Sequence, residues 1–175
     1  VDAAGNQSTP SSPATVVVDT VAAAAPSAAA GSEGSLSWRD VPSVTIGVDP
    51  TPGATTEHRT STDGGATWST PTTGTTITIT DEGETLVQFR TVDDAGNTSA
   101  WTPAHTGGPD AAGTARIDRT PPPAPAAGDI SGGSLDWTNA ASVTVTATPP
   151  PGMTAEYRTS TDGGTTWSTG TAGAG

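Results

Sequence analysis

The chain has 175 residues and a formal net charge of −12 at neutral pH, and all six of its basic residues are arginines. Its acidity argues against nucleic acids and anionic membranes as partners, because neither attracts a negatively charged protein. The absence of cysteine excludes disulfide frameworks, thiolate zinc sites and cysteine nucleophiles. Val, Ile, Leu and Phe number only 21 of 175 residues, which predicts thin cores and long loops.

The N-terminal residues contain a motif that returns later in the chain. Residues 1–6 (Val-Asp-Ala-Ala-Gly-Asn) reappear at residues 92–97 as Val-Asp-Asp-Ala-Gly-Asn. The second copy follows a predicted strand, residues 85–92, in which Val87, Phe89 and Thr91 alternate toward one face. Residues 1–8 therefore correspond to the end of a strand that begins outside this sequence, and residues 15–19 (Thr-Val-Val-Val-Asp) to the last strand of that domain.

Residues 20–31, rich in alanine, serine and proline, and the proline-rich residues 120–125 predict semi-rigid linkers. Between them the sequence predicts about seven short strands and no periodic helix. In residues 43–48, Val44, Ile46 and Val48 share one face. The other strands are predicted at residues 35–38, 75–80, 85–92 and 113–118, and in a hairpin over residues 56–69.

The predicted hairpin is the clearest sign of an internal repeat. Asp63-Gly64-Gly65 is predicted to form its turn, because glycine adopts positive φ freely and aspartate bonds to nearby backbone. Trp68 follows the turn. The same hairpin returns 99 residues later with Asp162, Gly163, Gly164 and Trp167, and residues 34–70 match residues 133–169 at 23 of 37 positions. A period of this size fits one small β-sandwich.

The repeat predicts an all-β chain with three parts. Residues 1–25 are the C-terminal end of one repeat plus a linker, residues 26–125 a complete repeat, and residues 126–175 the N-terminal half of a third. We therefore expect the chain to be a fragment of a longer protein. The remainder of each half repeat would lie outside it.

The motif at residues 92–99, followed by a strand ending at Ile117-Asp118 and a proline-rich linker, resembles bacterial Ig-like repeats of cell-surface and secreted proteins. The resemblance implies immunoglobulin- or fibronectin III-type β-sandwiches, joined as a stalk, spacer or adhesin arm of an exported protein. Neighbouring repeats would then be the main partners, with a carbohydrate or a host or cell-surface ligand as a further one. Neither nucleic acid nor membrane is expected.

A second resemblance concerns the hairpin alone. Residues 61–68 (Ser-Thr-Asp-Gly-Gly-Ala-Thr-Trp) and residues 160–167 are similar to the Asp-box of sialidase-type propellers. In that family the box is a structural hairpin remote from the active site, so we interpret Asp63 and Asp162 as turn residues. The alternative left open is an accessory carbohydrate-binding module of a secreted glycoside hydrolase.

Catalytic and metal-binding candidates are few. His58 and His105 are the only histidines, and no acid–base pair stands in a defined frame, so we expect no catalytic residues and no enzyme activity. Asp19, Asp93 and Asp118, at predicted strand ends, are candidate calcium ligands. The simpler interpretation is that they are solvated turn carboxylates, with no cofactor.

The tryptophans recur with the repeat. Trp38 and Trp68 return as Trp137 and Trp167, which favours packing in each core. A sugar-stacking platform is the alternative. Trp101 lies in a Gly/Pro-rich insertion, residues 100–113, that has no counterpart after the first motif.

Overall fold

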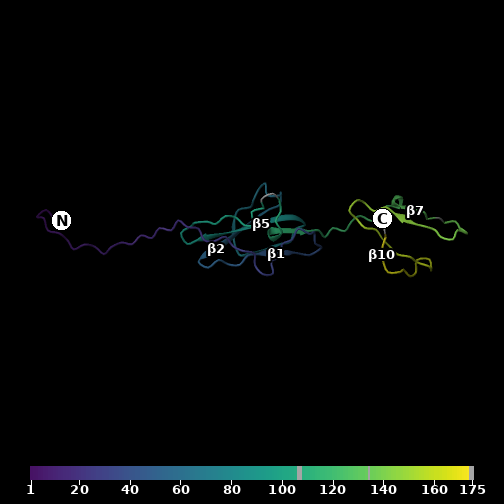
Figure 1. The fold of residues 1–175 in the computed structure, drawn as a ribbon, viewed down its shortest axis with the longest axis horizontal. Helices are drawn as coiled ribbons and strands as arrows, with labels where there is room; N and C mark the ends of the chain where they lie inside the picture. Colours follow the sequence, from purple (N-terminus) through teal and green to yellow (C-terminus); the bar gives the residue numbers. More distant parts are fainter. Residues whose placement is uncertain (106–107, 134, 174–175) are drawn as a thin grey trace. The chain divides into compact units, whose positions relative to one another are not determined.

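The computed structural model describes residues 1–105, 108–133 and 135–173. The chain is all-β, with two 3₁₀ turns, η1 (Ala111–Gly113) and η2 (Ala127–Asp129). It divides into two compact units, Val1–Arg119 and Thr120–Gly175, each described by itself below (Figure 1). Within the described ranges, no helix has the length and apolar character needed to cross a bilayer.

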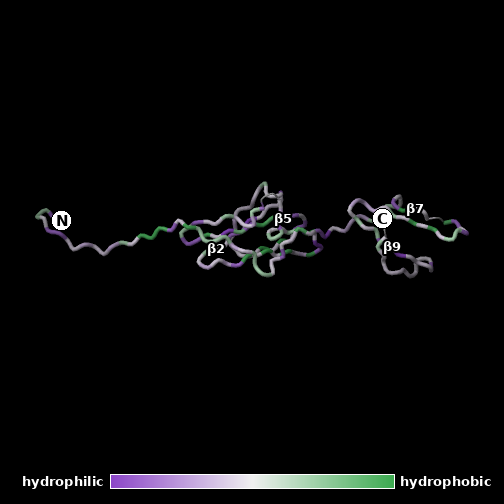
Figure 2. Tube along the Cα trace, viewed as in Figure 1, coloured by the Kyte–Doolittle hydropathy of each residue, from purple (hydrophilic) through white to green (hydrophobic). Residues whose placement is uncertain are grey.

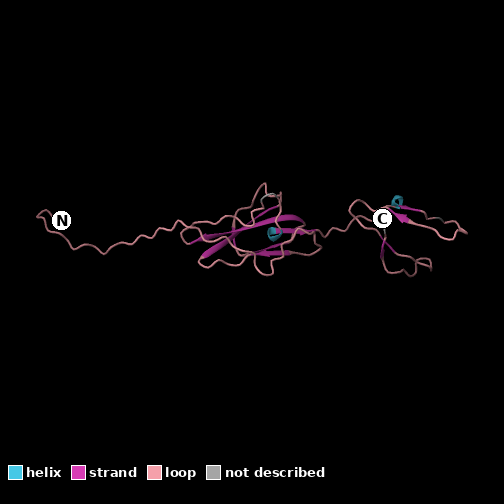
Figure 3. Ribbon diagram, viewed as in Figure 1, coloured by secondary structure: helices cyan, strands magenta, loops and turns pink. Residues whose placement is uncertain are grey.

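Unit 1 contains a four-stranded antiparallel sheet with the order β3-β2-β5-β6. Figure 3 draws the strands of the chain in magenta. Its longest pairing joins β2 (Ala54–Ser61) to β5 (Gly83–Asp93) over eight residues, from Ala54↔Asp93 to Ser61↔Leu86. The outer strands are β3 (Thr72–Thr73) beside β2 and β6 (Thr114–Ile117) beside β5. Residues in this sheet alternate between an inner and an outer face.

A second, two-stranded sheet pairs β1 (Val44–Gly47) with β4 (Thr76–Ile79), in the register Val44↔Ile79. Ala28 extends it by bridging to Val48. The hydrophobic core joins the two sheets, and Figure 2 shows the apolar segments that supply it. Its buried members on the side of the two-stranded sheet are Val44, Ile46, Val48 and Ile79. Those from the four-stranded sheet are Val87, Phe89, Ala115 and Ile117.

The predicted inward residues are therefore confirmed in β1 and in β5, where Val87, Phe89 and Thr91 are at most 1% exposed, although Leu86 and Gln88 on the other face of β5 are also buried. Residues 15–19, predicted as the last strand of the preceding repeat, form no strand in this structure. Val16, Val17 and Val18 are 79–86% exposed and no neighbouring strand pairs with them, so nothing stabilises an extended ladder there.

Two further boundaries differ from the prediction. Residues 35–38 form no strand, although the backbone N–H groups of Ser35 and Arg39 donate to Thr114 and Arg116 carbonyls. The linker predicted at residues 20–31 is wrong in its second half, because Pro26 is buried and Ala28 pairs with Val48. These residues belong to the sandwich-like unit rather than to a spacer.

Unit 2 consists of two short ribbons. The strand β7 (Ile130–Ser131) pairs with β8 (Thr146–Ala147), and β9 (Glu156–Tyr157) pairs with β10 (Thr171–Ala172). Val143 and Val145 are 56% and 60% exposed, whereas Val44 and Ile46, 99 residues earlier, are 1% exposed. None of the buried hydrophobic residues in the described ranges lies in this unit.

Candidate functional site

The outer face of the four-stranded sheet holds two pairs of polar side chains opposite each other. Arg59 of β2 faces Gln88 of β5, and Glu57 faces Arg90. The Arg59 Nε and Nη2 atoms donate to Gln88 Oε1 at 3.0 and 2.8 Å. Arg90 forms an ion pair with Glu57 Oε2 at 2.8 Å. Strand alternation puts these groups on the face opposite to the core.

Two tryptophans stack on these arginines. The Arg59 guanidinium carbon lies 4.7 Å from the Trp68 ring centroid and 4.2 Å from that of Trp101. Arg90 lies 4.6 Å from the same Trp101 ring, and the His105 ring is 6.0 Å from Trp68. We call Trp68, Arg59, Trp101 and Arg90 the arginine–tryptophan stack. Each cation–π contact contributes about 0.5–2 kcal/mol, depending on desolvation.

The stack also perturbs Arg59 electrostatically. Burial, followed by the nearby positive charge of Arg90, lowers the pKa of Arg59 from its usual range. Both guanidiniums nevertheless remain close to carbonyl, carboxylate or π-electron density, which compensates for their partial desolvation. The stack is therefore a satisfied network rather than an open cationic patch.

Trp68 is placed by the turn that precedes it. The Asp63 carboxylate accepts hydrogen bonds from Thr67 N at 2.9 Å, Thr67 Oγ1 at 2.5 Å and Ser61 Oγ at 2.7 Å. Gly64 and Gly65 have φ of 72° and 91°, a region that favours glycine. Hydrogen bonds from Thr67, and then from Ser61, hold the pKa of Asp63 well below its usual range.

Unit 2 forms the same turn, although none of its described hydrophobic residues is buried. Asp162 accepts from Thr166 N at 2.9 Å, Thr166 Oγ1 at 2.6 Å and Ser160 Oγ at 2.7 Å. Arg158 lies 4.9 Å from the Trp167 ring centroid, as Arg59 does near Trp68. The turn and its first arginine–tryptophan contact are therefore encoded locally.

The insertion, residues 100–113, completes the stack in unit 1. Thr102 and Phe89 exchange two backbone hydrogen bonds of 2.8 Å, which places Trp101 beside β5. Gln88 Nε2 donates to the Pro103 carbonyl at 2.9 Å. His105 Nδ1 accepts from Asp110 N at 3.0 Å, so its Nε2 carries the proton and donates to the Val87 carbonyl at 3.0 Å.

The expectation that the tryptophans pack in the cores is wrong. Trp38, Trp137 and Trp167 are 56%, 104% and 51% exposed, and Trp68 and Trp101 are half-buried in the stack. The space between the sheets is filled by Val, Ile and one Phe, and Trp68 projects from a turn. The sequence signal for the stack was limited to Arg90, which alternation puts on the outward face of the strand predicted at residues 85–92; that this strand lies beside the one carrying Arg59 is shown by the β2–β5 pairing.

The two histidines do not assemble a catalytic group. His58 lies on the inner side, 5.9 Å from the Phe89 ring, with its Nδ1 atom 3.5 Å from the Gly74 carbonyl. His105 bonds to backbone groups, as described above. Neither ring contacts a serine hydroxyl or a carboxylate through these bonds.

Of the three candidate calcium ligands, Asp19 and Asp93 lie near each other, because Asn97 Nδ2 donates to the Asp19 carbonyl and to Asp93 Oδ2, whereas Asp118 lies near the opposite end of β5. Asp93 Oδ1 accepts from Ala95 N at 3.0 Å and Asn97 N at 2.8 Å, and the Asn97 side chain lowers its pKa. Asp19 Oδ1 accepts from Val21 N at 2.9 Å. Asp118 lies after β6, where its N–H donates to the Arg39 carbonyl. In the described ranges, no group of three or more acidic, histidine or cysteine side chains is placed to hold a metal ion.

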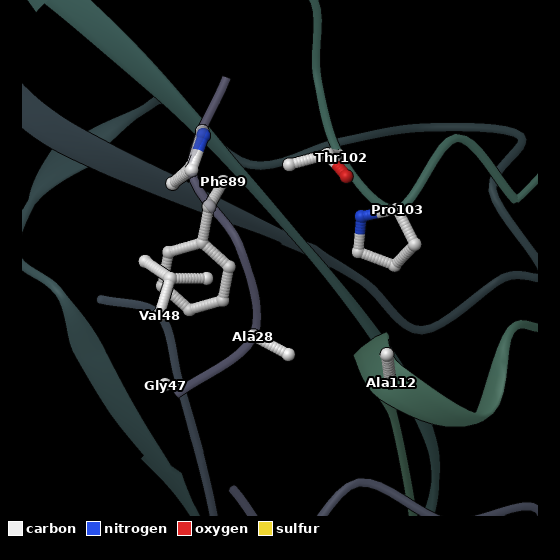
Figure 4. Close-up of a pocket in the computed structure, with 8 residues that line it drawn as sticks. Ala28, Gly47, Val48, Phe89, Thr102, Pro103 and Ala112 are labelled. Carbon is white, nitrogen blue, oxygen red and sulfur yellow. The ribbon is translucent and has the colours of Figure 1, made fainter. Parts of the chain in front are cut away.

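A small cavity lies beside Phe89, between the entering chain and the insertion (Figure 4). Its volume is about 50 Å³ and its lining includes Pro26, Ala28, Val48 and Pro103. A space of this size holds a water molecule or two but no organic ligand. We therefore assign it no binding role.

Comparisons with protein-family models, curated proteins and solved structures gave no match to this chain.

Proposed function

We propose that the chain is a series of Ig-like β-sandwich repeats, of the immunoglobulin or fibronectin III type, that acts as a non-catalytic spacer. In this proposal it forms a stalk or adhesin arm of an exported bacterial surface or secreted protein. Neighbouring repeats are its main partners. The proposal depends above all on how unit 1 holds the segment that leads into it.

Two side chains hold that segment: Thr91, near the end of β5, and Asn97, in the turn that follows. Asn97 Nδ2 donates to the Asp19 carbonyl at 3.2 Å, and Thr91 Oγ1 donates to the Ala24 carbonyl at 2.9 Å. Thr91 is 0% exposed, so the entering chain satisfies a hydroxyl that would otherwise be buried without a partner. A spacer needs ordered joints, and this contact orders the approach to the repeat.

Asn97, which binds the entering segment, is itself held in place by Asp93. Asp93 accepts from Asn97 N at 2.8 Å and from Asn97 Nδ2 at 2.9 Å. The same turn forms at the N-terminus, where Asp2 accepts from Asn6 N at 2.9 Å and from Asn6 Nδ2 at 2.8 Å. The recurrence of this turn supports the idea that each repeat binds the linker before it in the same way.

The accessory carbohydrate-binding alternative has less support. A sugar-stacking platform presents open aromatic faces, whereas two guanidiniums lie within 5 Å of the Trp101 ring centroid and one lies near Trp68. We expect soluble polysaccharides in an affinity gel to leave the migration of the chain unchanged. Retardation lost in Trp101→Ala would favour the carbohydrate-binding alternative.

Limited digestion with elastase tests the ordered joint. We expect rapid cleavage in residues 14–18 and slow cleavage at residues 22–25 in the native chain, because Thr91 binds the Ala24 carbonyl and Asn97 binds the Asp19 carbonyl just before this segment. Asn97→Ala should speed cleavage at residues 22–25 by about tenfold. Asn6→Ala, the matched change in the N-terminal turn, should leave that rate unchanged. Equal cleavage of both segments in the native chain would count against the proposal.

A further inference from the structure

The segment that precedes β1 connects the two sheets of unit 1. Residues 27–33 lie beside β1, and residues 35–39 lie beside β6. Backbone hydrogen bonds of 2.8–3.1 Å hold both parts, and they run from Ala29 N to Gly47 O, from Glu33 N to Thr45 O, from Ser35 N to Thr114 O and from Arg39 N to Arg116 O. The entering chain is therefore bound first to one sheet and then to the other.

Residues 35–39 and β6 run in the same direction. Arg39 bridges Ile117 in the parallel sense, and the Asp118 N–H donates to the Arg39 carbonyl at 3.0 Å. The chain continues toward the N-terminus from the beginning of the first segment and toward the C-terminus from the end of β6. Tension between the two ends of unit 1 therefore slides these segments past each other and strains all of their hydrogen bonds together.

The points at which the chain enters and leaves unit 1 lie near opposite ends of β5. Asn97, in the turn after β5, binds the Asp19 carbonyl. Arg119 N, two residues after β6, donates to Glu82 Oε1 at 2.8 Å, just before β5 begins. The 11 residues of β5 separate these points, so tension between them runs along the strands rather than across them.

Two arginine side chains add hydrogen bonds between β6, with the residues that follow it, and the entering segment. Arg116 Nη1 donates to the Leu36 carbonyl, while its Nη2 atom forms an ion pair with Glu84 Oε2 at 2.7 Å. Arg119 Nη1 donates to the Pro42 carbonyl at 3.4 Å. Hydrogen bonds from a charged donor are stronger than neutral ones, so these side chains reinforce the backbone bonds between the same segments.

We propose that residues 35–42 and 114–119 form a shear patch through which unit 1 resists tension along the chain. Arg116 and Arg119 are its positioning residues, because they bind β6 and the residues after it to the entering segment. The bonds of the patch must break together before unit 1 unfolds from its ends. This inference rests on the proposed spacer function, since a spacer between two anchored modules carries tension.

The test holds the full 175-residue chain at constant force in magnetic tweezers and measures the lifetime of folded unit 1. One geometry attaches the chain at its two termini. The other attaches it at the C-terminus and through Asp40→Cys, which is a unique anchor because the chain has no native cysteine. Terminal attachment strains the shear patch along its length, whereas attachment at residue 40 peels β6 away one bond at a time. Forced unfolding follows the unfolding rate, and we expect a lifetime at least about tenfold longer under terminal attachment.

Two matched variants separate the shear patch from general stability. Arg116→Met and Arg90→Met each remove one ion pair, with Glu84 at 2.7 Å and with Glu57 at 2.8 Å, and each removes one contact with a tryptophan. Only Arg116 also binds the Leu36 carbonyl. We expect Arg116→Met to reduce the ratio of the two lifetimes at least about threefold and Arg90→Met to leave it unchanged. A general loss of stability would shorten both lifetimes and preserve their ratio.

Equal lifetimes of the native chain in the two geometries would overturn the inference, as would an equal change of the ratio in the two variants. Circular dichroism checks that both variants fold, and Arg119→Met replaces Arg116→Met if the latter does not. Elastase cleavage at residues 22–25 is measured without tension. Failure of the shear patch is therefore distinguishable from failure of the ordered joint.

Discussion

Arg59 and Gln88 face each other across β2 and β5, and two nitrogens of the arginine donate to the single Oε1 atom of the glutamine. Gln88 is 4% exposed and its amide nitrogen donates to the Pro103 carbonyl. One residue pair thus ties together both central strands and the insertion.

Replacing Arg59 tests the centre of the stack. Arg59→Ala removes two charge-assisted hydrogen bonds and two cation–π contacts, so we expect a loss of about 2–3 kcal/mol in the free energy of unfolding. Urea denaturation followed by circular dichroism measures it. Arg158→Ala, the matched change in unit 2, should cost less than about 0.5 kcal/mol, because that arginine is exposed. Equal effects would contradict the role of the stack.

Trp101 tests the contribution of the insertion. Trp101→Ala leaves Arg59 and Arg90 without their shared ring, and we expect a cost of about 1.5–3 kcal/mol in the same assay. Trp38→Ala should cost under about 1 kcal/mol, since that ring is 56% exposed. Should the two variants unfold alike, the Trp101 ring would contribute no more than an ordinary surface tryptophan.

Gly113 tests the closeness of the insertion to β5. A Cβ atom at this position would lie 2.5 Å from the Val87 carbonyl oxygen and would also overlap the Pro103 ring. Gly113→Ala should therefore destabilise unit 1 by about 1–3 kcal/mol. Gly128→Ala, at a glycine whose added Cβ would meet no atom within 4 Å, should be neutral. Differential scanning calorimetry compares the two melting temperatures.

The Asp63 turn predicts a loss of stability in acid. Hydrogen bonds from Thr67 and Ser61 lower the pKa of Asp63 in the folded chain, so the folded state binds fewer protons than the unfolded state. The carboxylate thus stabilises the fold above its unfolded pKa of about 4, and this contribution is lost as the pH falls through the lower folded value.

Melting temperatures between about pH 2 and pH 6 measure this dependence. Asp63→Asn should lower the melting temperature at pH 6 and flatten its fall in acid. Asp162→Asn changes the same turn in unit 2, where no core is described, and should leave the melting of unit 1 unaltered. An Asp63→Asn profile parallel to that of the native chain would show that the turn carboxylate has no part in acid unfolding.

The two units should differ in resistance to proteolysis. Unit 1 buries its apolar side chains between two sheets, whereas Val143 and Val145 in unit 2 are more than half exposed. We expect thermolysin to cut within residues 126–173 well before residues 43–92. Mass spectrometry of the fragments identifies the sites. Early cleavage inside β2 or β5 would show that the proposed order of stability is reversed.

Part of the fold could be predicted from sequence. Alternation placed Val44, Ile46, Val87 and Phe89 inside, because a half-buried strand repeats its environment every two residues. The arginine–tryptophan stack could not be predicted. Trp68 belongs to a local turn motif, but the β2–β5 pairing places Arg90 beside Arg59, and no local pattern specifies that pairing.

The comparison of the two copies separates the local from the tertiary contribution. The Asp63 and Asp162 turns have the same hydrogen bonds, although only the first adjoins a core, because every donor and acceptor lies within a few residues. The length of the strand before each turn, by contrast, differs between the two copies. β2 extends over eight residues and β9 over two, in spite of their similar sequences. A strand is stabilised by hydrogen bonds and burial from a partner, and only β2 has β5 beside it.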